Sequence, residues 1–160
     1  MLQQTSVARV TNGTRRILLV EDNPADANLS RIVHEETKHC SWLQIIENGE
    51  KALRYLRGEG EYSGTCKPDV ILLDLTLPIT SGLEMISQIR SVPDCELMPI
   101  VIISGAENPI ELRQAYELGA SCVIIKPTQW KEYFEKLDAC YKFWCSVVQL
   151  PPKTNGYAKN

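Results

Sequence analysis

The chain has 160 residues, of which 44% are hydrophobic and 23% are charged, and its formal net charge at pH 7 is -3. These values are typical of one soluble globular domain, and the slight negative charge gives no general attraction to nucleic acid. No apolar run approaches the ~18 residues of a membrane span, and residues 1–16 lack the apolar centre of a signal peptide. We therefore expect a cytoplasmic protein that does not contact a membrane.

Short apolar runs alternate with amphipathic segments along the chain. After a polar leader at residues 1–15, the run at 17–20 predicts a strand, and Pro24 favours the first turn of a helix. Residues 41–49 predict a second strand, and a short helix follows from Gly49. A glycine-rich loop at 58–68 then leads to the apolar run 70–73, which is typical of a strand buried on both faces.

The second half continues the alternation. We predict a helix at 81–90, a strand at 99–104, a helix at 109–118, a strand at 120–127, and a long helix from residue 129 that Pro151 and Pro152 end. Strands that alternate with helices predict an α/β fold with a parallel sheet and helices on both faces. We expect this domain to span residues 16–150, followed by a loose tail at 151–160.

Polar side chains follow four of the predicted strands. Glu21 and Asp22 come after the first strand, Asp74 after the third, Ser104 ends the fourth, and Lys126 follows the fifth. Taken singly, such an Asp or Ser is more often a turn former and such a Lys a surface residue. Because parallel strands end at the same edge of a sheet, these side chains are instead expected to meet in one cleft.

Three crowded carboxylates repel one another unless a cation lies among them, and oxygen ligands favour Mg²⁺. With a cation reducing the repulsion, Asp74 is placed to attack phosphorus and form an aspartyl phosphate. Lys126 would supply a positive charge for the phosphoryl oxygens, and Ser104 a hydroxyl donor.

The segments "LLVEDN", "DVILLDLTLPITSG", "VIISG" and "IIKP" together resemble the receiver domain of two-component response regulators. The resemblance implies a five-stranded, flavodoxin-like, doubly wound (βα)5 fold in which a histidine kinase phosphorylates Asp74. It also implies that Mg²⁺ is held by Asp22, Asp74 and the backbone carbonyl of Thr76, and by Glu21 through water.

The same resemblance implies a cis Lys126–Pro127 peptide bond and a switch that couples Ser104 to an aromatic residue three positions before the lysine. Here that position is Val123, which cannot make the usual aromatic movement. Within the family, the loop at 58–68 and the segment "FWCSVVQLPP" are similar to single-domain regulators of phytochrome kinases. Those relatives imply a homodimer through the fourth helix, the fifth strand and the fifth helix.

We therefore predict a stand-alone phosphoacceptor that assists its own phosphorylation and signals through protein association, rather than an enzyme that turns over an external substrate. A phosphorylation-independent binding module is the alternative; the complete acidic site argues against it, whereas Val123 argues mildly for it. A haloacid-dehalogenase-type phosphatase needs an Asp two residues after the nucleophile, where this chain has Thr76. A flavodoxin needs a phosphate-binding loop, whereas "EDNPAD" lacks phosphate-binding glycines and carries the carboxylates of Glu21 and Asp22, which would repel a phosphate.

The six cysteines and two histidines do not form a recognisable motif. The cysteines are scattered without a Cys-x-x-Cys pair, so the sequence indicates neither a zinc site nor a redox motif, and we expect reduced thiols. They are Cys40, Cys66, Cys95, Cys122, Cys140 and Cys145. We expect surface or packing roles for His34 and His39.

Overall fold

The computed structural model describes residues 14–105 and 107–153, and its centre is a five-stranded parallel sheet with the strand order β2-β1-β3-β4-β5. The strands are β1 (Arg16–Val20), β2 (Trp42–Ile46), β3 (Val70–Asp74), β4 (Ile100–Ser104) and β5 (Cys122–Ile125). The helices are α1 (Pro24–Thr37), α2 (Gly49–Arg57), α3 (Gly82–Arg90), α4 (Pro109–Glu117) and α5 (Trp130–Lys142). The predicted doubly wound fold is confirmed, and no described helix is long and apolar enough to cross a membrane.

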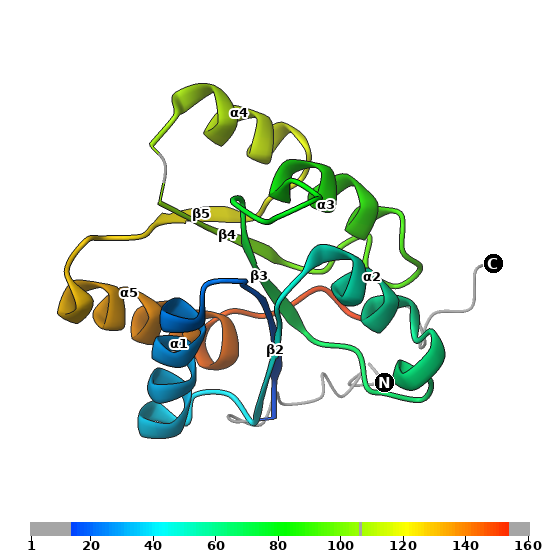
Figure 1. The fold of residues 1–160 in the computed structure, drawn as a ribbon. Coiled ribbons are helices and arrows are strands. Elements are labelled where there is room, and N and C mark those ends of the chain that lie inside the picture. The colour runs from blue at the N-terminus through cyan, green and yellow to red at the C-terminus, as the bar shows by residue number, and fades with distance from the viewer. Residues whose placement is uncertain (1–13, 106, 154–160) are drawn as a thin grey trace, which may run out of the picture.

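The sheet separates two hydrophobic cores. Figure 1 shows α1 and α5 on one side of the sheet and α2, α3 and α4 on the other. In β1, Leu18 and Val20 pack with α2 and α3, whereas Ile17 and Leu19 pack with α1 and α5. Successive side chains of a strand point to opposite faces, so a strand covered on both faces needs an unbroken apolar run.

Side-chain caps fix where four of the helices begin, just beyond the carboxyl ends of the strands. Asn23, Asn48, Ser81 and Asn108 each accept a backbone N–H of the first helical turn. Such caps satisfy amide groups that have no partner within the helix. The strand-to-helix loops, and the side chains they carry, are therefore held at one edge of the sheet.

The last helix differs from the single long helix predicted from the sequence. The α-helix ends at Lys142, and a π-helical turn covers Phe143–Val147. Arg15 donates to the carbonyls of Trp144 and Val148 at 2.5 and 2.6 Å, and the Val148 amide donates to the Phe143 carbonyl at 3.0 Å. Both carbonyls that Arg15 binds therefore lie within this turn or directly after it.

The proposed limits of the domain stay a prediction, because residues 1–13 and 154–160 lie outside the described part. Residues assigned to the leader and the tail nevertheless make contacts within it. Arg15 is buried, and Lys153 forms an ion pair with Asp69 at 2.7 Å.

Candidate functional site at the carboxyl edge of the sheet

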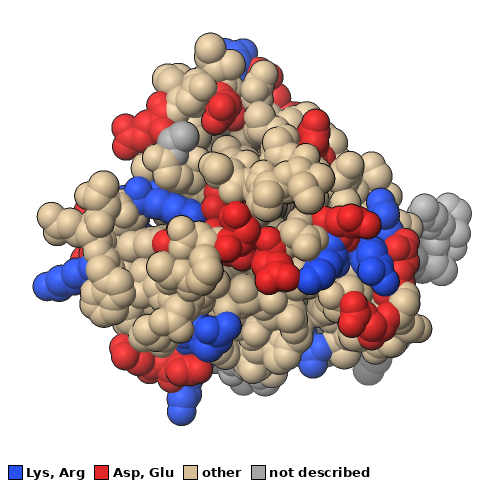
Figure 2. All heavy atoms as spheres, in the orientation of Figure 1, with Lys and Arg blue, Asp and Glu red and all other residues tan. Residues whose placement is uncertain are grey.

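Four strand ends bring the predicted site residues to one edge. In the register of the sheet, Asp74 on β3 lies beside Ile103 on β4, and Ser104 lies beside Ile125 on β5. The Lys126 amide donates to the Ser104 carbonyl at 2.8 Å, which continues the pairing by one residue. Figure 2 shows Asp and Glu side chains gathered at the centre of this face, where β1 and β3 end.

Lys126 is the centre of the site. Its Nζ lies 2.7 Å from Oε2 of Glu21, 2.8 Å from Oδ2 of Asp26 and 2.8 Å from Oδ2 of Asp74. The lysine side chain is only 13% exposed, and those of Glu21 and Asp74 are buried. An ammonium has three N–H donors, so each of these carboxylates takes one.

Backbone amides orient the two buried carboxylates. The amide of Asn23 donates to Oε1 of Glu21 at 3.0 Å, and the amide of Thr76 donates to Oδ1 of Asp74 at 2.8 Å. Each carboxylate thus has one oxygen on a backbone N–H and the other on Lys126. Because both oxygens are held, the strand-end carboxylates are fixed in direction before any ligand binds.

Burial and pairing change the proton affinities of the site. Burial raises the pKa of Glu21 to about 7, although hydrogen bonds from Lys126 and from the Asn23 amide lower it in part. Burial by itself lowers the pKa of Lys126, but its hydrogen bonds to Asp26, Asp74 and Glu21 outweigh this effect, and the pKa is raised. Lys126 therefore stays positively charged at neutral pH.

Three of the carboxylates form a set that fits a hard cation. One oxygen each from Glu21, Asp22 and Asp74 lie within 4.8 Å of one another. Asp22 is exposed, which leaves an open side for water or a ligand. An all-oxygen donor set with an open side suits Mg²⁺, which keeps several waters when it binds to proteins.

The other predicted site residues lie at the same edge. Ser104 is fully buried at the end of β4, and Thr76 is exposed in the loop after β3. The backbone amide of Thr76 donates to Asp74, whereas the role of its carbonyl as a metal ligand stays a prediction. The role of the Ser104 hydroxyl toward a phosphoryl group also stays a prediction.

Gly82 allows the loop after Asp74 to close tightly. A Cβ atom at this position would lie 2.4 Å from Cα of Leu75 and 2.6 Å from the carbonyl oxygen of Asp74. Both are backbone atoms, which cannot move aside as a flexible side chain would. A glycine is therefore required where the start of α3 packs against the end of β3.

The expectation of a cis Lys126–Pro127 bond is wrong for this structure, since no peptide bond within residues 14–105 and 107–153 is cis. The trans form is the intrinsically favoured one even before proline, by roughly 0.5–1 kcal/mol. With this bond trans, Lys126 still contacts Asp74.

Two residues of the site region were not found from the sequence. Asp26, in the first turn of α1, joins the Lys126 cluster. An acidic residue in a first turn is ordinarily explained by the helix dipole, and only its position four residues after Asp22 hinted at the site.

The second residue is Tyr116 of α4, whose hydroxyl oxygen accepts a hydrogen bond from the Val123 amide at 3.2 Å. An aromatic ring from α4 thus reaches the position of β5 that lacks an aromatic residue of its own.

Comparisons with known proteins agree with the fold and the site. The family model described as the response regulator receiver domain matches residues 17–138. The response regulator Rcp1 of Synechocystis sp. (strain PCC 6803) is 33% identical over 141 residues, which cover 88% of this chain and 96% of Rcp1. A probable methanogenesis regulatory protein, FilR2 of Methanothrix harundinacea, is 32% identical over 135 residues, covering 84% of this chain and 86% of FilR2.

Two solved structures are also similar. The phosphorylated cyanobacterial phytochrome response regulator RcpA has a TM-score of 0.83 and 34% identity, covering 88% of this chain and 100% of RcpA. The Mn²⁺-bound form of Rcp1 has a TM-score of 0.81 and 33% identity, covering 86% of this chain and 99% of that one. The family model, these relatives and the acidic strand-end site agree, and the chain belongs to the response regulator receiver family.

Proposed function

We propose that Asp74 is the phosphoacceptor of this response regulator and that a histidine kinase is the donor. The observation that carries the proposal is the placement of Asp74, a buried strand-end carboxylate with one oxygen on Lys126 and the other on a backbone amide. In the reaction, Oδ2 of Asp74 forms the bond to phosphorus while the bond between phosphorus and the kinase histidine nitrogen breaks.

The residues around Asp74 fit this transfer. Lys126 already lies at Oδ2 of Asp74, so its charge is in place for the phosphoryl oxygens that arrive there. Glu21, Asp22 and Asp74 would hold a Mg²⁺, which reduces the repulsion between the acidic cluster and the phosphoryl group. The chain assists its own phosphorylation in this way and acts as the acceptor.

The same edge carries apolar side chains suited to a protein donor. Ile79 in the loop after β3, Ile110 in the first turn of α4 and Trp130 at the start of α5 are all largely exposed. Each lies beyond the carboxyl end of a strand, on the side of Asp74. Exposed apolar side chains around a polar site are typical of protein-binding surfaces. The likeness to RcpA supports a kinase of the phytochrome type.

We propose that phosphorylation alters association, with a homodimer as the expected form, through the surface made by α4, β5 and α5. Tyr116 and Leu118 are exposed at α4, and Phe143 and Val147 are exposed beyond α5. Aromatic and aliphatic side chains of this kind are enriched at protein interfaces. Phosphorylation would then shift an equilibrium between arrangements of this surface.

The test is incorporation of a phosphoryl group from a small acyl phosphate, followed by intact-protein mass, on the wild type, Asp74→Asn and the control Asp69→Asn. We expect one Mg²⁺-dependent adduct on the wild type and the control, and none on Asp74→Asn. A size-exclusion profile of each product reads out assembly. An unmodified wild type that is folded and supplied with Mg²⁺ would instead support a binding module that works without phosphorylation.

A further inference from the structure

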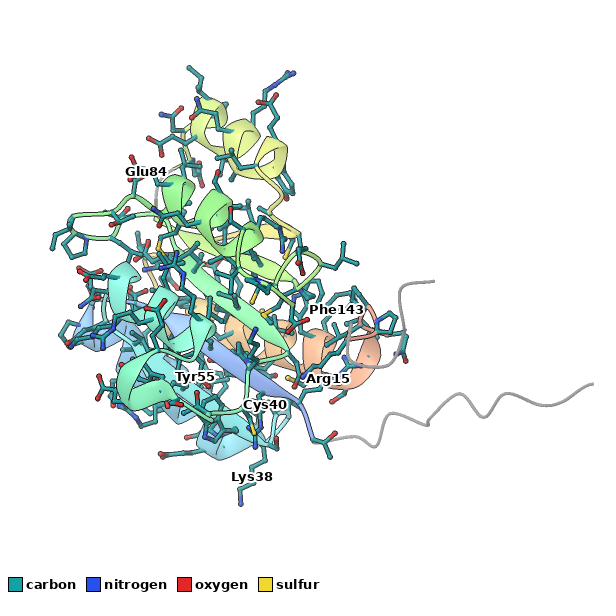
Figure 3. The ribbon with its side chains drawn as sticks, turned by 90° about the vertical axis from the view of Figure 1, so that its right-hand side faces the viewer. Arg15, Lys38, Cys40, Tyr55, Glu84 and Phe143 are labelled. Atoms are coloured by element: carbon teal, nitrogen blue, oxygen red, sulfur yellow. The ribbon has the colours of Figure 1, made fainter. Side chains whose placement is uncertain are left out.

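A second cluster of reactive side chains lies at the amino end of the strands, away from Asp74. Cys40 is in the loop between α1 and β2, and Cys145 is in the π-helical turn after α5. Both cysteines belong to the core that α1 and α5 cover, and each changes the pKa of the other. Sγ of Cys40 lies 3.2 Å from Nδ1 of His34. Figure 3 shows Arg15, Cys40 and Lys38 together at this end of the molecule.

The surroundings distinguish the two thiols. Cys40 is 3% exposed and belongs to the lining of a surface hollow, together with His34, Glu35, Lys38 and Ser41. Cys145 is 0% exposed. Cys40 therefore borders the hollow, whereas Cys145 is closed off from solvent.

The pKa values of the two thiols also distinguish Cys40 from Cys145. Burial lowers the pKa of His34, so its imidazole is neutral at pH 7 and Nδ1 can accept the proton of the Cys40 thiol. The Cys145 side chain lowers the pKa of Cys40, whereas Cys40 together with burial raises the pKa of Cys145. The thiolate is the reactive form of cysteine, which makes Cys40 the nucleophile of the pair.

One residue holds both cysteine segments. The Arg15 carbonyl accepts from the amide of Ser41 at 2.9 Å and from its hydroxyl at 3.0 Å, directly beside Cys40. The Arg15 guanidinium binds the carbonyls of Trp144 and Val148, on either side of Cys145 in the chain. Arg15 therefore fixes the segment of Cys40 relative to the segment of Cys145.

We propose that Cys40 and Cys145 are an oxidation site, in which a hydroperoxide oxidises Cys40 and Cys145 converts the product to a disulfide. In the first step the Cys40 thiolate attacks one peroxide oxygen, the O–O bond breaks, and the sulfenic acid and hydroxide form. The hydroxide takes up the proton that the Cys40 thiol released and becomes water. In the second step the Cys145 sulfur displaces the sulfenic oxygen as a second water, so that two thiols and one hydrogen peroxide give one disulfide and two waters.

The site is separate from the phosphorylation chemistry. Cys40 precedes β2 by two residues and so lies at the amino end of the sheet, whereas Asp74 is the last residue of β3 at the carboxyl end. The disulfide would tie the loop after α1 to the turn that presents Phe143 and Val147. We expect it to stiffen that exposed surface and to leave phosphoryl incorporation on Asp74 unchanged.

The test exposes the full chain to hydrogen peroxide, blocks the remaining thiols with iodoacetamide and maps the peptides without reduction. We expect a Cys40–Cys145 cross-linked peptide that dithiothreitol abolishes. Cys95→Ala, which removes a buried thiol from the other core, should leave the cross-link intact. Cross-links between other cysteines, or oxidation confined to the exposed Cys66, would overturn the proposal.

Two variants separate the roles of the thiols. With Cys145→Ala, the sulfenic acid on Cys40 should accumulate and react with dimedone, whereas Cys40→Ala should leave Cys145 unmodified. His34→Gln should slow formation of the sulfenic acid on the Cys145→Ala background. Equal dimedone labelling of Cys40 in Cys145→Ala and of Cys145 in Cys40→Ala would contradict the assignment. The cross-link in the wild type tests the pairing even where a variant folds poorly.

Discussion

At the scale of single residues, Lys126 has two kinds of partner. Glu21 and Asp74 belong to the carboxylate set that fits a cation, whereas Asp26 lies outside it. When a cation neutralises that set, the attraction of Glu21 and Asp74 for the lysine weakens, but that of Asp26 does not. We therefore expect Asp26 to hold the ammonium near Asp74 when a cation and a phosphoryl group are bound.

The first prediction concerns Asp26. Asp26→Asn should slow phosphoryl incorporation roughly 10- to 150-fold, because a hydrogen bond to a charged group contributes roughly 1.5–3 kcal/mol. The measurement is the initial rate with an acyl phosphate and saturating Mg²⁺. Glu36→Gln makes the same charge change at an exposed position of α1 and serves as the control. Equal rates for the two variants would refute the positioning role.

The second prediction concerns Glu21. Since burial raises its pKa to about 7, a cation must displace a proton from this carboxyl at lower pH. Mg²⁺ affinity should rise roughly tenfold per pH unit up to about pH 7 and level off above it. Titration calorimetry between pH 5.5 and 8 measures this slope, and Glu21→Gln should remove it. A wild-type affinity that is constant below pH 7 would show that Glu21 is already ionised there.

The strand-end residues could be predicted because the carboxyl ends of parallel strands share one edge of the sheet. Buried apolar runs identify those ends, which placed Glu21, Asp74 and Lys126 correctly. Asp26 could not be assigned, since its position in a first turn has an ordinary explanation. The thiol pair could not be predicted either, because 105 residues separate Cys40 from Cys145 (145 minus 40) and no local pattern joins them.

At the scale of elements, helix periodicity predicted where α5 begins but not the π-helical turn after it. Two carbonyls in and after that turn are bound by Arg15, which precedes β1 and is distant in sequence. The contact between α4 and β5 is likewise tertiary. The Tyr116 hydroxyl accepts the amide of Val123, which offers a link between the two elements at the position where the family's aromatic residue is absent.

The third prediction tests that link. Tyr116→Phe keeps the ring and removes the acceptor, so the Val123 amide should exchange with solvent about 2- to 10-fold faster, as expected for the loss of a hydrogen bond worth roughly 0.5–1.5 kcal/mol. Hydrogen exchange by NMR gives the rate at this amide. The Ile102 amide on the buried β4 is an internal reference that should not change. No change at Val123 would mean that the hydroxyl does not join α4 to β5.

At the scale of the whole molecule, Arg15 connects the residues before β1 to the helical turn after α5. Arg15 is buried and its guanidinium donates to two carbonyls, so its loss leaves partly buried acceptors without this partner. The fourth prediction is that Arg15→Gln lowers the melting temperature by about 5–10 °C. Arg31→Gln, at an exposed position of α1, should change it little. Equal melting temperatures for the two variants would show that the Arg15 contacts add no stability.

The two ends of the sheet carry different chemistry. The carboxyl end holds the acidic cluster around Lys126, and the amino end holds the thiols around Arg15. The central claim is that Asp74 accepts the phosphoryl group. Borohydride reduction of the phosphorylated protein converts an aspartyl phosphate to homoserine, and peptide mass mapping locates it. We predict homoserine at position 74; homoserine at another aspartate, or a phosphoryl group on His34 or His39, would contradict the claim.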